Sequence, residues 1–101
     1  MKSSEKKSNF GQLLDAYRRE RRISQLNLER ALNQKGYPIT NGLISKYEHG
    51  KIDPSPEFIH AVVIYIDLSQ EEAGALIEAH LADVALRFWN RYNRYEAQIS
   101  K

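Results

Sequence analysis

The chain of 101 residues contains no cysteine, which excludes a disulfide framework and any metal site built on thiolate ligands. It also lacks a run approaching the roughly 20 apolar residues that a helix needs to span a bilayer. The basic residues at its start are not followed by a hydrophobic region, so they do not resemble a signal peptide. These absences predict a soluble, cytoplasmic protein with no membrane partner, and no residue pattern points to a cofactor.

Signatures of catalysis are missing as well. The sequence has no glycine-rich phosphate loop, no nucleophile elbow and no paired acid–base motif. Its three histidines, His49, His60 and His80, fall in separate predicted helices without the spacing of metal ligands. The pair Glu71–Glu72 is better explained by the start of a helix, where acidic side chains are favoured. We therefore expect neither an enzyme nor a metal site.

Positive charge is absent from one long part of the chain. Residues 52–86 contain seven Asp and Glu and no Lys or Arg, a balance of −7. Residues 1–51 carry eleven basic and five acidic residues, a balance of +6, and residues 87–101 carry four and one, a balance of +3. The net charge of only +2 conceals this segregation. Such a chain can turn a basic face toward a polyanion and keep its acidic face away.

The chain does contain enough apolar residues, 42%, for one modest core, as expected of a single domain. Apolar positions recur with helical spacing and predict five helices and no strand. We expect a flexible basic arm at residues 1–8, a main domain at residues 9–80 and a helical extension at residues 81–101. The run 62–66, in the fourth helix, also has strand-like propensity.

Short polar residues and glycine mark the ends of these helices. Side chains suited to N-caps precede the first four helices, namely Ser8 or Asn9, Ser24, Thr40 and Ser55. Pro56 suits the first position of the fourth helix, and Ser69 with Glu72 forms a capping box for the fifth. Gly50 is expected to close the third helix in the left-handed conformation.

Residues 40–50 carry the clearest functional signal. Ile44 is an apolar anchor, whereas Asn41, Ser45 and Lys46 can point to the opposite side of the same short helix. The DNA major groove is wide enough for one helix and offers donors and acceptors to short polar side chains. This segment is therefore predicted to contact base pairs.

Three blocks of sequence occur in a fixed order around this segment. They are Phe10-Gly11-x-x-Leu14-x-x-x-Arg18, Ile23-Ser24-Gln25-x-x-Leu28, and Ile44-Ser45-Lys46-Tyr47-Glu48-x-Gly50-Lys51 followed by Pro54-Ser55. Together they resemble the lambda-repressor-like (Cro/XRE) helix-turn-helix family of DNA-binding regulators, over about residues 9–80. The resemblance implies an all-α, five-helix lambda-repressor-like helix-turn-helix bundle with an extended C-terminal helix.

The resemblance also implies roles for individual residues. Gln25 matches a position that contacts a phosphate or a base edge, and Lys51 suits a phosphate contact after the recognition helix. Arg18 and Glu48 match a structural ion pair between the first and third helices. The basic cluster at residues 18–22 fits either a phosphate contact or a solvated helix end. The candidate DNA-binding residues are Arg22, Gln25, Thr40, Asn41, Gly42, Ser45, Lys46 and Lys51.

The connection between the second and third helices departs from the family pattern. The spacing from Gln25 to Ile44 is longer than in the compact form of the motif, so residues 33–37 are expected to lengthen the second helix or widen the turn. Glu29 stands where the family usually has alanine, and it is expected to rotate outward.

An apolar stripe continues beyond the residues that the resemblance covers. It comprises Ile77, Leu81, Val84, Phe88, Tyr92, Tyr95 and Ile99, and Trp89 widens it. Burial of each such side chain contributes about 1.5–3 kcal/mol, so the stripe predicts a partner surface. The candidate homodimer interface is Val84, Phe88, Trp89, Tyr92 and Tyr95. The alternatives are a helix that folds back onto its own domain, or arginines and aromatics that bind single-stranded nucleic acid.

These expectations combine in a sequence-specific, double-stranded DNA-binding transcriptional regulator. The expected form is a repressor that acts as a homodimer on a palindromic operator. A protein-interaction adaptor of the same fold is the alternative, in which the acidic middle or the aromatic end is the working surface. A related alternative is an antitoxin, which binds a toxin and also its own promoter.

Overall fold

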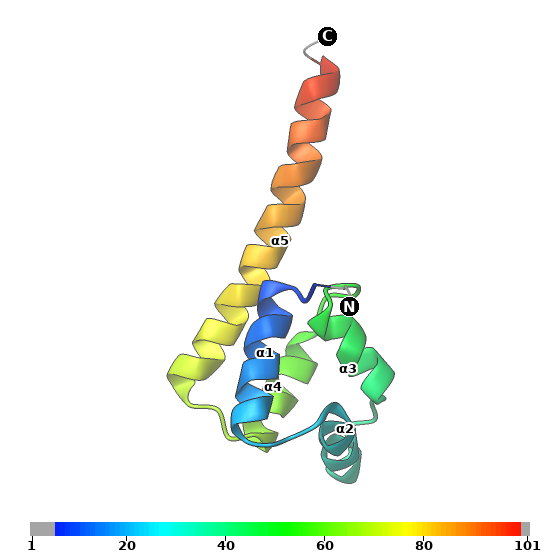
Figure 1. Cartoon of the computed structure of the whole chain (residues 1–101), viewed down its shortest axis with the longest axis vertical. Coiled ribbons are helices and arrows are strands. Elements are labelled where there is room, and N and C mark those ends of the chain that lie inside the picture. Colours follow the sequence, from blue (N-terminus) through cyan, green and yellow to red (C-terminus); the bar gives the residue numbers. More distant parts are fainter. Residues whose placement is uncertain (1–5, 100–101) are drawn as a thin grey trace.

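Five α-helices and no strand make up residues 6–99, the part of the chain that the computed structural model describes (Figure 1). The helices are α1 (Asn9–Glu20), α2 (Gln25–Gln34), α3 (Asn41–Glu48), α4 (Pro56–Tyr65) and α5 (Gln70–Ile99). The predicted all-α class is thereby confirmed. Most of the expected basic arm, residues 1–5, lies outside the described residues.

The first four helices begin at the N-caps that the sequence indicates. The side-chain oxygens of Ser8, Ser24, Thr40 and Ser55 each accept a hydrogen bond from the backbone N–H three residues later. Pro56 takes the first position of α4, where its missing N–H costs nothing. The run 62–66 is helical to Tyr65, because the cap and a buried face outweigh the strand propensity of its β-branched residues.

The predicted capping box opens α5. The N–H of Ser69 donates to Glu72 Oε1 at 2.9 Å, and the N–H of Glu72 donates to Ser69 Oγ at 3.0 Å. Arg21, at the end of α1, donates to the same carboxylate at 3.0 Å. The Ser69 N–H foremost, assisted by Arg21 and opposed by partial desolvation, lowers the pKa of the Glu72 carboxyl from its ordinary value.

The variant Glu72→Gln tests this electrostatic contribution. A carboxyl whose pKa is lower in the folded state stabilises the fold above its unfolded pKa, and this stabilisation is lost as the pH falls through the folded value. Glutamine can still accept from Ser69 but carries no charge to titrate. Between about pH 5 and pH 3, urea unfolding is expected to show a smaller loss of stability in the variant than in the parent. Equal losses would contradict this role of Glu72.

Four helices end with one residue in the left-handed backbone region. Gly36 (φ +85°) follows α2 and Gly50 (φ +72°) follows α3, as predicted for Gly50. Arg22 (φ +57°) and Asp67 (φ +56°) take the same place after α1 and α4. In each case the residue that follows donates its backbone N–H to the carbonyl five positions before it, at 2.8–3.0 Å. Because side chains disfavour this region, packing must impose the turns at the two non-glycine positions.

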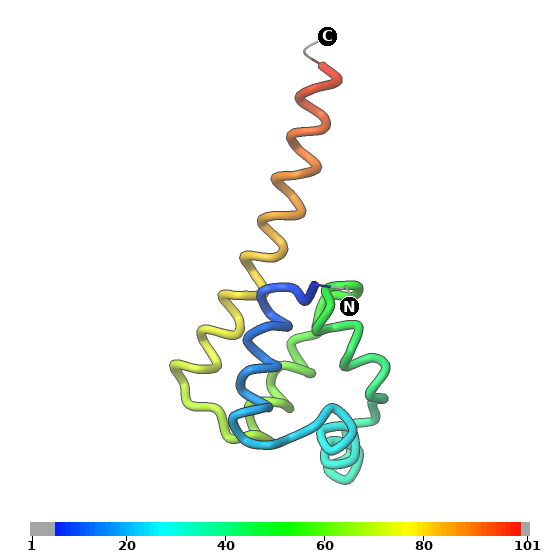
Figure 2. The backbone as a smooth tube through the Cα atoms, viewed as in Figure 1, coloured from blue at the N-terminus to red at the C-terminus, as the bar shows by residue number. Residues whose placement is uncertain are grey.

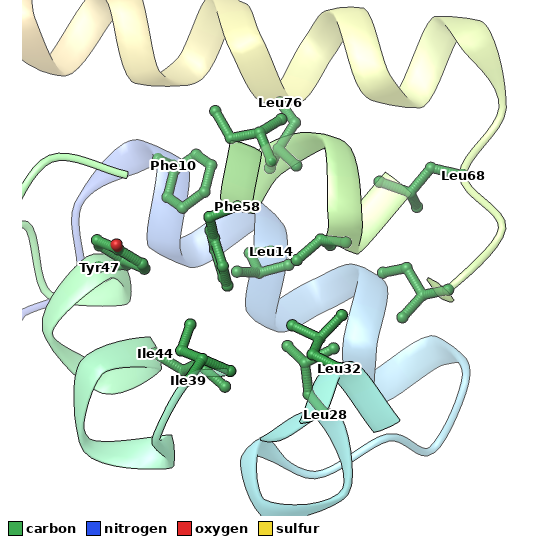
Figure 3. Close-up of a cluster of buried hydrophobic side chains, with 13 residues drawn as sticks. Phe10, Leu14, Leu28, Leu32, Ile39, Ile44, Tyr47, Phe58, Leu68 and Leu76 are labelled. Carbon is green, nitrogen blue, oxygen red and sulfur yellow. The ribbon is translucent and has the colours of Figure 1, made fainter. Parts of the chain in front are cut away.

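One hydrophobic core lies between the helices (Figure 3). Every helix contributes to it, although α5 contributes Leu76 alone. Burial, together with the nearby Tyr37, raises the pKa of the Tyr47 hydroxyl. The core residues are Phe10, Leu14, Leu28, Leu32, Ile39, Ile44, Tyr47, Phe58, Ile59, Val62, Ile66, Leu68 and Leu76.

The last helix packs on α1 with its first half and then leaves the bundle (Figures 1 and 2). Asp83 accepts hydrogen bonds from the backbone N–H groups of Asn9 and Phe10, at 2.9 and 3.0 Å. Arg87 reaches Asp53 at 2.7 Å, and every described residue after it is exposed. The helix therefore does not fold back onto its own domain, which was the alternative to a partner surface. Within residues 6–99 no helix is both long and apolar enough to cross a membrane.

Candidate nucleic-acid interface

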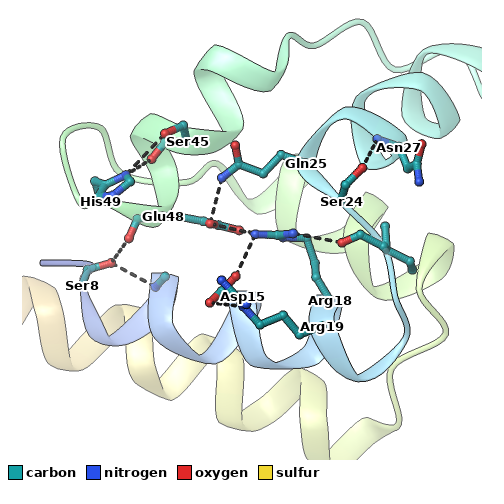
Figure 4. Close-up of polar contacts among 12 residues, drawn as sticks. Ser8, Asp15, Arg18, Arg19, Ser24, Gln25, Asn27, Ser45, Glu48 and His49 are labelled. Carbon is teal, nitrogen blue, oxygen red and sulfur yellow. Dashed lines mark hydrogen bonds and ion pairs between the residues drawn. The ribbon is translucent and has the colours of Figure 1, made fainter. Parts of the chain in front are cut away.

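The ion pair expected between the first and third helices is present and buried (Figure 4). Arg18 donates from Nε to Glu48 Oε2 at 2.8 Å and from Nη2 to Glu48 Oε1 at 3.1 Å. The exposed fraction is 6% for Arg18 and 0% for Glu48. Two parallel hydrogen bonds fix the relative orientation of the side chains, so the pair sets the position of α3 against α1.

Neighbouring groups satisfy the rest of this pair. Arg18 also donates to Asp15 Oδ1 at 3.0 Å and to the Ile23 carbonyl at 2.9 Å. Gln25 donates from Nε2 to Glu48 Oε1 at 2.9 Å, which attaches the start of α2 to α3. Among the described residues, no buried side-chain nitrogen or oxygen lacks a partner. A fully satisfied network of this kind holds its members rigidly.

Helix α3 turns a polar side to solvent. Thr40, Asn41, Gly42 and Lys46 are exposed, whereas Ser45 is half-buried. The opposite side of the helix carries Ile44 and Tyr47 into the core (Figure 3). A Cβ at Gly42 would meet only the Thr40 hydroxyl, at 3.8 Å, so the backbone is open to close approach at this point. The amphipathic helix expected from the sequence is confirmed.

The longer connection between α2 and α3 is ordered by side-chain hydrogen bonds. Asn33 donates to the Ile39 carbonyl at 3.0 Å and accepts from the Ile39 N–H at 3.1 Å. Glu29 accepts from the backbone N–H of Asn41, where a carboxylate complements the positive end of the α3 dipole. Glu29 is half-buried and lies over the N-terminus of α3.

The remaining candidates lie on either side of α3. Arg22 shares a shallow depression with Gln25 at the turn between α1 and α2, where the N-terminus of α2 also favours anions. Lys51 is exposed in the loop after α3. The Ser45 hydroxyl lies 3.3 Å from His49 Nδ1. A contact with this histidine therefore takes up part of the hydrogen-bonding capacity of the hydroxyl.

Sequence reasoning missed three neighbours of the candidate residues: Asp15, Glu29 as a helix cap, and His49. The Asp15 contact depends on how α1 crosses α3, and no local signal distinguishes it from other surface carboxylates. His49 was recoverable in principle, because it lies four residues after Ser45 on the same helix face.

The predicted interface residues of α5 lie on another part of the molecule. Val84 is 37% exposed and Phe88 is 71% exposed. The exposed fractions of Trp89, Tyr92 and Tyr95 lie between these two values. Trp89 stacks on Tyr92 with ring centroids 5.5 Å apart. No group of three or more potential metal ligands occurs among the described residues.

Comparisons with protein-family models, with curated proteins and with solved structures gave no match to this chain.

Proposed function

We propose that this chain is a sequence-specific, double-stranded DNA-binding transcriptional regulator with a lambda-repressor-like helix-turn-helix arrangement. In this arrangement α2 and α3 are the two helices of the motif, and α3 enters the major groove. The observation that carries the proposal is the exposed polar side of α3 on a buried anchor. The groove accepts one helix presented in this way.

The proposed contacts divide into base readout and phosphate binding. Asn41 can pair with adenine N6 and N7, and Lys46 with guanine O6 and N7. Ser45 can reach either kind of base, and Gly42 lets the backbone approach. Phosphate contacts come from groups at the edges of this surface, which supply affinity and salt dependence without sequence information. Those groups are Arg22, Gln25, Thr40 and Lys51.

Repression follows sterically when an occupied operator excludes polymerase. Dimers of this class read two half-sites with the same symmetry as the protein. We therefore propose a homodimer on a palindromic operator.

A salt titration on random duplex DNA tests the proposed partner. A protein that neutralises several phosphates loses affinity linearly on a logarithmic scale as salt increases, with a slope of about −0.9 per phosphate. A slope of several units is expected here. A flat titration would favour the second candidate, a protein-interaction adaptor, to which the acidic segment 52–86 and the exposed aromatics of α5 point.

The variant Lys46→Ala tests base readout. If Lys46 contacts a base, its loss is expected to weaken binding to the preferred site by about 1–3 kcal/mol and to relax preference at one position. Fluorescence anisotropy on a site obtained by random-oligonucleotide selection provides the measurement. Lys35→Ala removes the same charge from the connection between α2 and α3 and is expected to leave the ranking of sites unchanged. An unaltered isotherm for Lys46→Ala would remove this residue from the base contacts.

A further inference from the structure

The apolar stripe on α5 has an internal repeat. Ile77, Leu81 and Val84 are followed eleven residues later by Phe88, Tyr92 and Tyr95, and Ile99 begins a third unit. A spacing of eleven residues keeps side chains in one line along a nearly straight helix. All seven side chains are 37–74% exposed. The stripe is therefore a continuous, open surface along most of α5.

This surface is separate from the side of α5 that packs on the bundle. Leu76, Asp83 and Arg87 contact the rest of the chain, and at 100° per residue they lie about a third of a turn from the stripe. The bundle therefore covers neither the stripe beside it nor the helix beyond Arg87. A second helix can lie along the whole stripe without displacing anything.

We propose that the occupant is α5 of a second copy in antiparallel orientation. In this dimer a twofold axis crosses the stripe at the level of residue 86. The exposed second half of each helix lies beside the half of the other helix that packs on its bundle. The inference specifies the homodimer of the proposed function, but it stands on α5 alone and its tests need no DNA.

The stripe is self-complementary in this register. Ile77 faces Tyr95 of the second copy, Leu81 faces Tyr92, and Val84 faces Phe88, and each pair is centred within half a residue of position 86. Each pair sets an aliphatic side chain against an aromatic one, so that large and small residues alternate across the interface. A twofold axis repeats every contact, as an isologous interface requires.

A groove on the bundle receives the end of the second helix. It lies between α4 and the first half of α5, has a volume of about 400 Å³ and is mostly apolar. Its walls include Ile59 and Val63 from α4 and Ala73, Ile77 and His80 from α5. Because Ile77 belongs to both the groove and the stripe, the same register brings Tyr95 and Ile99 of the second copy to this groove.

Charge complementarity selects the antiparallel orientation. Residues 70–86 of α5 contain four acidic and no basic residues, whereas residues 87–99 contain three arginines and one glutamate. Antiparallel pairing sets the basic half of each helix against the acidic half of the other. Parallel pairing would set like charges side by side, which disfavours association. The basic half cannot reach the acidic half of its own helix, since α5 is continuous from Gln70 to Ile99.

The area available is adequate for a stable dimer. Aromatic side chains bury about 150–250 Å² each, and the stripe contains three aromatics that are at least 45% exposed, together with four aliphatic residues. The stripe thus offers several hundred Å² per copy, and the groove adds to it. A standard interface buries about 800 Å² per partner.

Cysteine cross-linking tests the orientation, and the absence of native cysteine makes it unambiguous. Leu81→Cys and Tyr92→Cys proteins are prepared separately and oxidised alone or after mixing. A disulfide-linked dimer is expected only in the mixture, because position 81 faces position 92 of the other copy. Cross-linking of each variant alone would show parallel pairing and overturn the proposed orientation.

Light scattering tests whether the stripe forms the dimer at all. The parent is expected at twice the chain mass of 11.7 kDa, and Phe88→Glu is expected at the monomer mass with unchanged helix content by circular dichroism. Leu86→Glu is the matched control, because Leu86 is 55% exposed on α5 but lies off the stripe; it should remain dimeric. A monomeric parent, or a dimeric Phe88→Glu, would overturn the inference. Neither result would touch the salt titration that tests DNA binding.

Discussion

Replacing Gly11 with alanine is expected to lower the free energy of unfolding by more than about 3 kcal/mol, beyond the usual cost of overpacking. Gly11 lies where α1 crosses the end of α3. A Cβ there would overlap the carbonyl group of Glu48 and lie 2.7 Å from its Cα. The backbone of α3 cannot simply yield, because the same carbonyl accepts from the N–H and the hydroxyl of Ser8, both at 3.1 Å. The two helices would have to separate.

Gly74→Ala provides the matched control for this substitution. Gly74 is also helical, but a Cβ there would have no atom within 4 Å. Alanine in such a position should stabilise the helix by about 1 kcal/mol. Urea unfolding followed by circular dichroism measures both variants. If Gly11→Ala were as stable as Gly74→Ala, the close contact between α1 and α3 would be wrong.

Removing Arg18 is expected to have a similarly large effect. Arg18→Ala should cost about 3–5 kcal/mol, as is typical when one partner of a buried ion pair is lost. The carboxylate of Glu48, which is 0% exposed in the parent, would lose its charged partner and keep Gln25 as its remaining side-chain donor. Denaturant unfolding near neutral pH provides the measurement.

Two further variants separate this effect from a general loss of charge. Arg19→Ala removes an arginine whose side chain is 75% exposed and paired with Asp15, so it should change stability by less than about 1 kcal/mol. In the double variant Arg18→Met, Glu48→Gln no unpaired charge remains, and stability should recover relative to Arg18→Ala. Failure of the double variant to recover would mean that shape, rather than charge, dominates the site.

Local signals were sufficient for much of this architecture. Ser24, Thr40 and Ser55 cap their helices as predicted, because an N-cap needs only a short polar side chain and the next turn. The ends at Arg22 and Asp67 were not predictable in this way, since neither position carries the glycine that normally marks a left-handed C-terminus. Their conformation depends on where the following helix must pack.

The candidate site likewise combines features that local sequence predicts with features that depend on packing. The polar side of α3 follows from its sequence, because Ile44 and Tyr47 define the buried side. The contact of Gln25 with Glu48 joins residues 23 positions apart, and the use of Asp83 as a cap for α1 joins residues more than 70 apart. Such contacts depend on how the helices cross, which periodicity does not specify.

The hydrogen bond from Gln25 to Glu48 has a thermodynamic consequence. It connects the start of α2 with the end of α3, while Arg18 holds the same carboxylate from α1. Three segments are thus immobilised before any ligand arrives, and the entropy of ordering them has already been lost on folding. Preorganised surfaces retain more of their contact energy as affinity, so a ligand docking on α3 should bind with little backbone rearrangement.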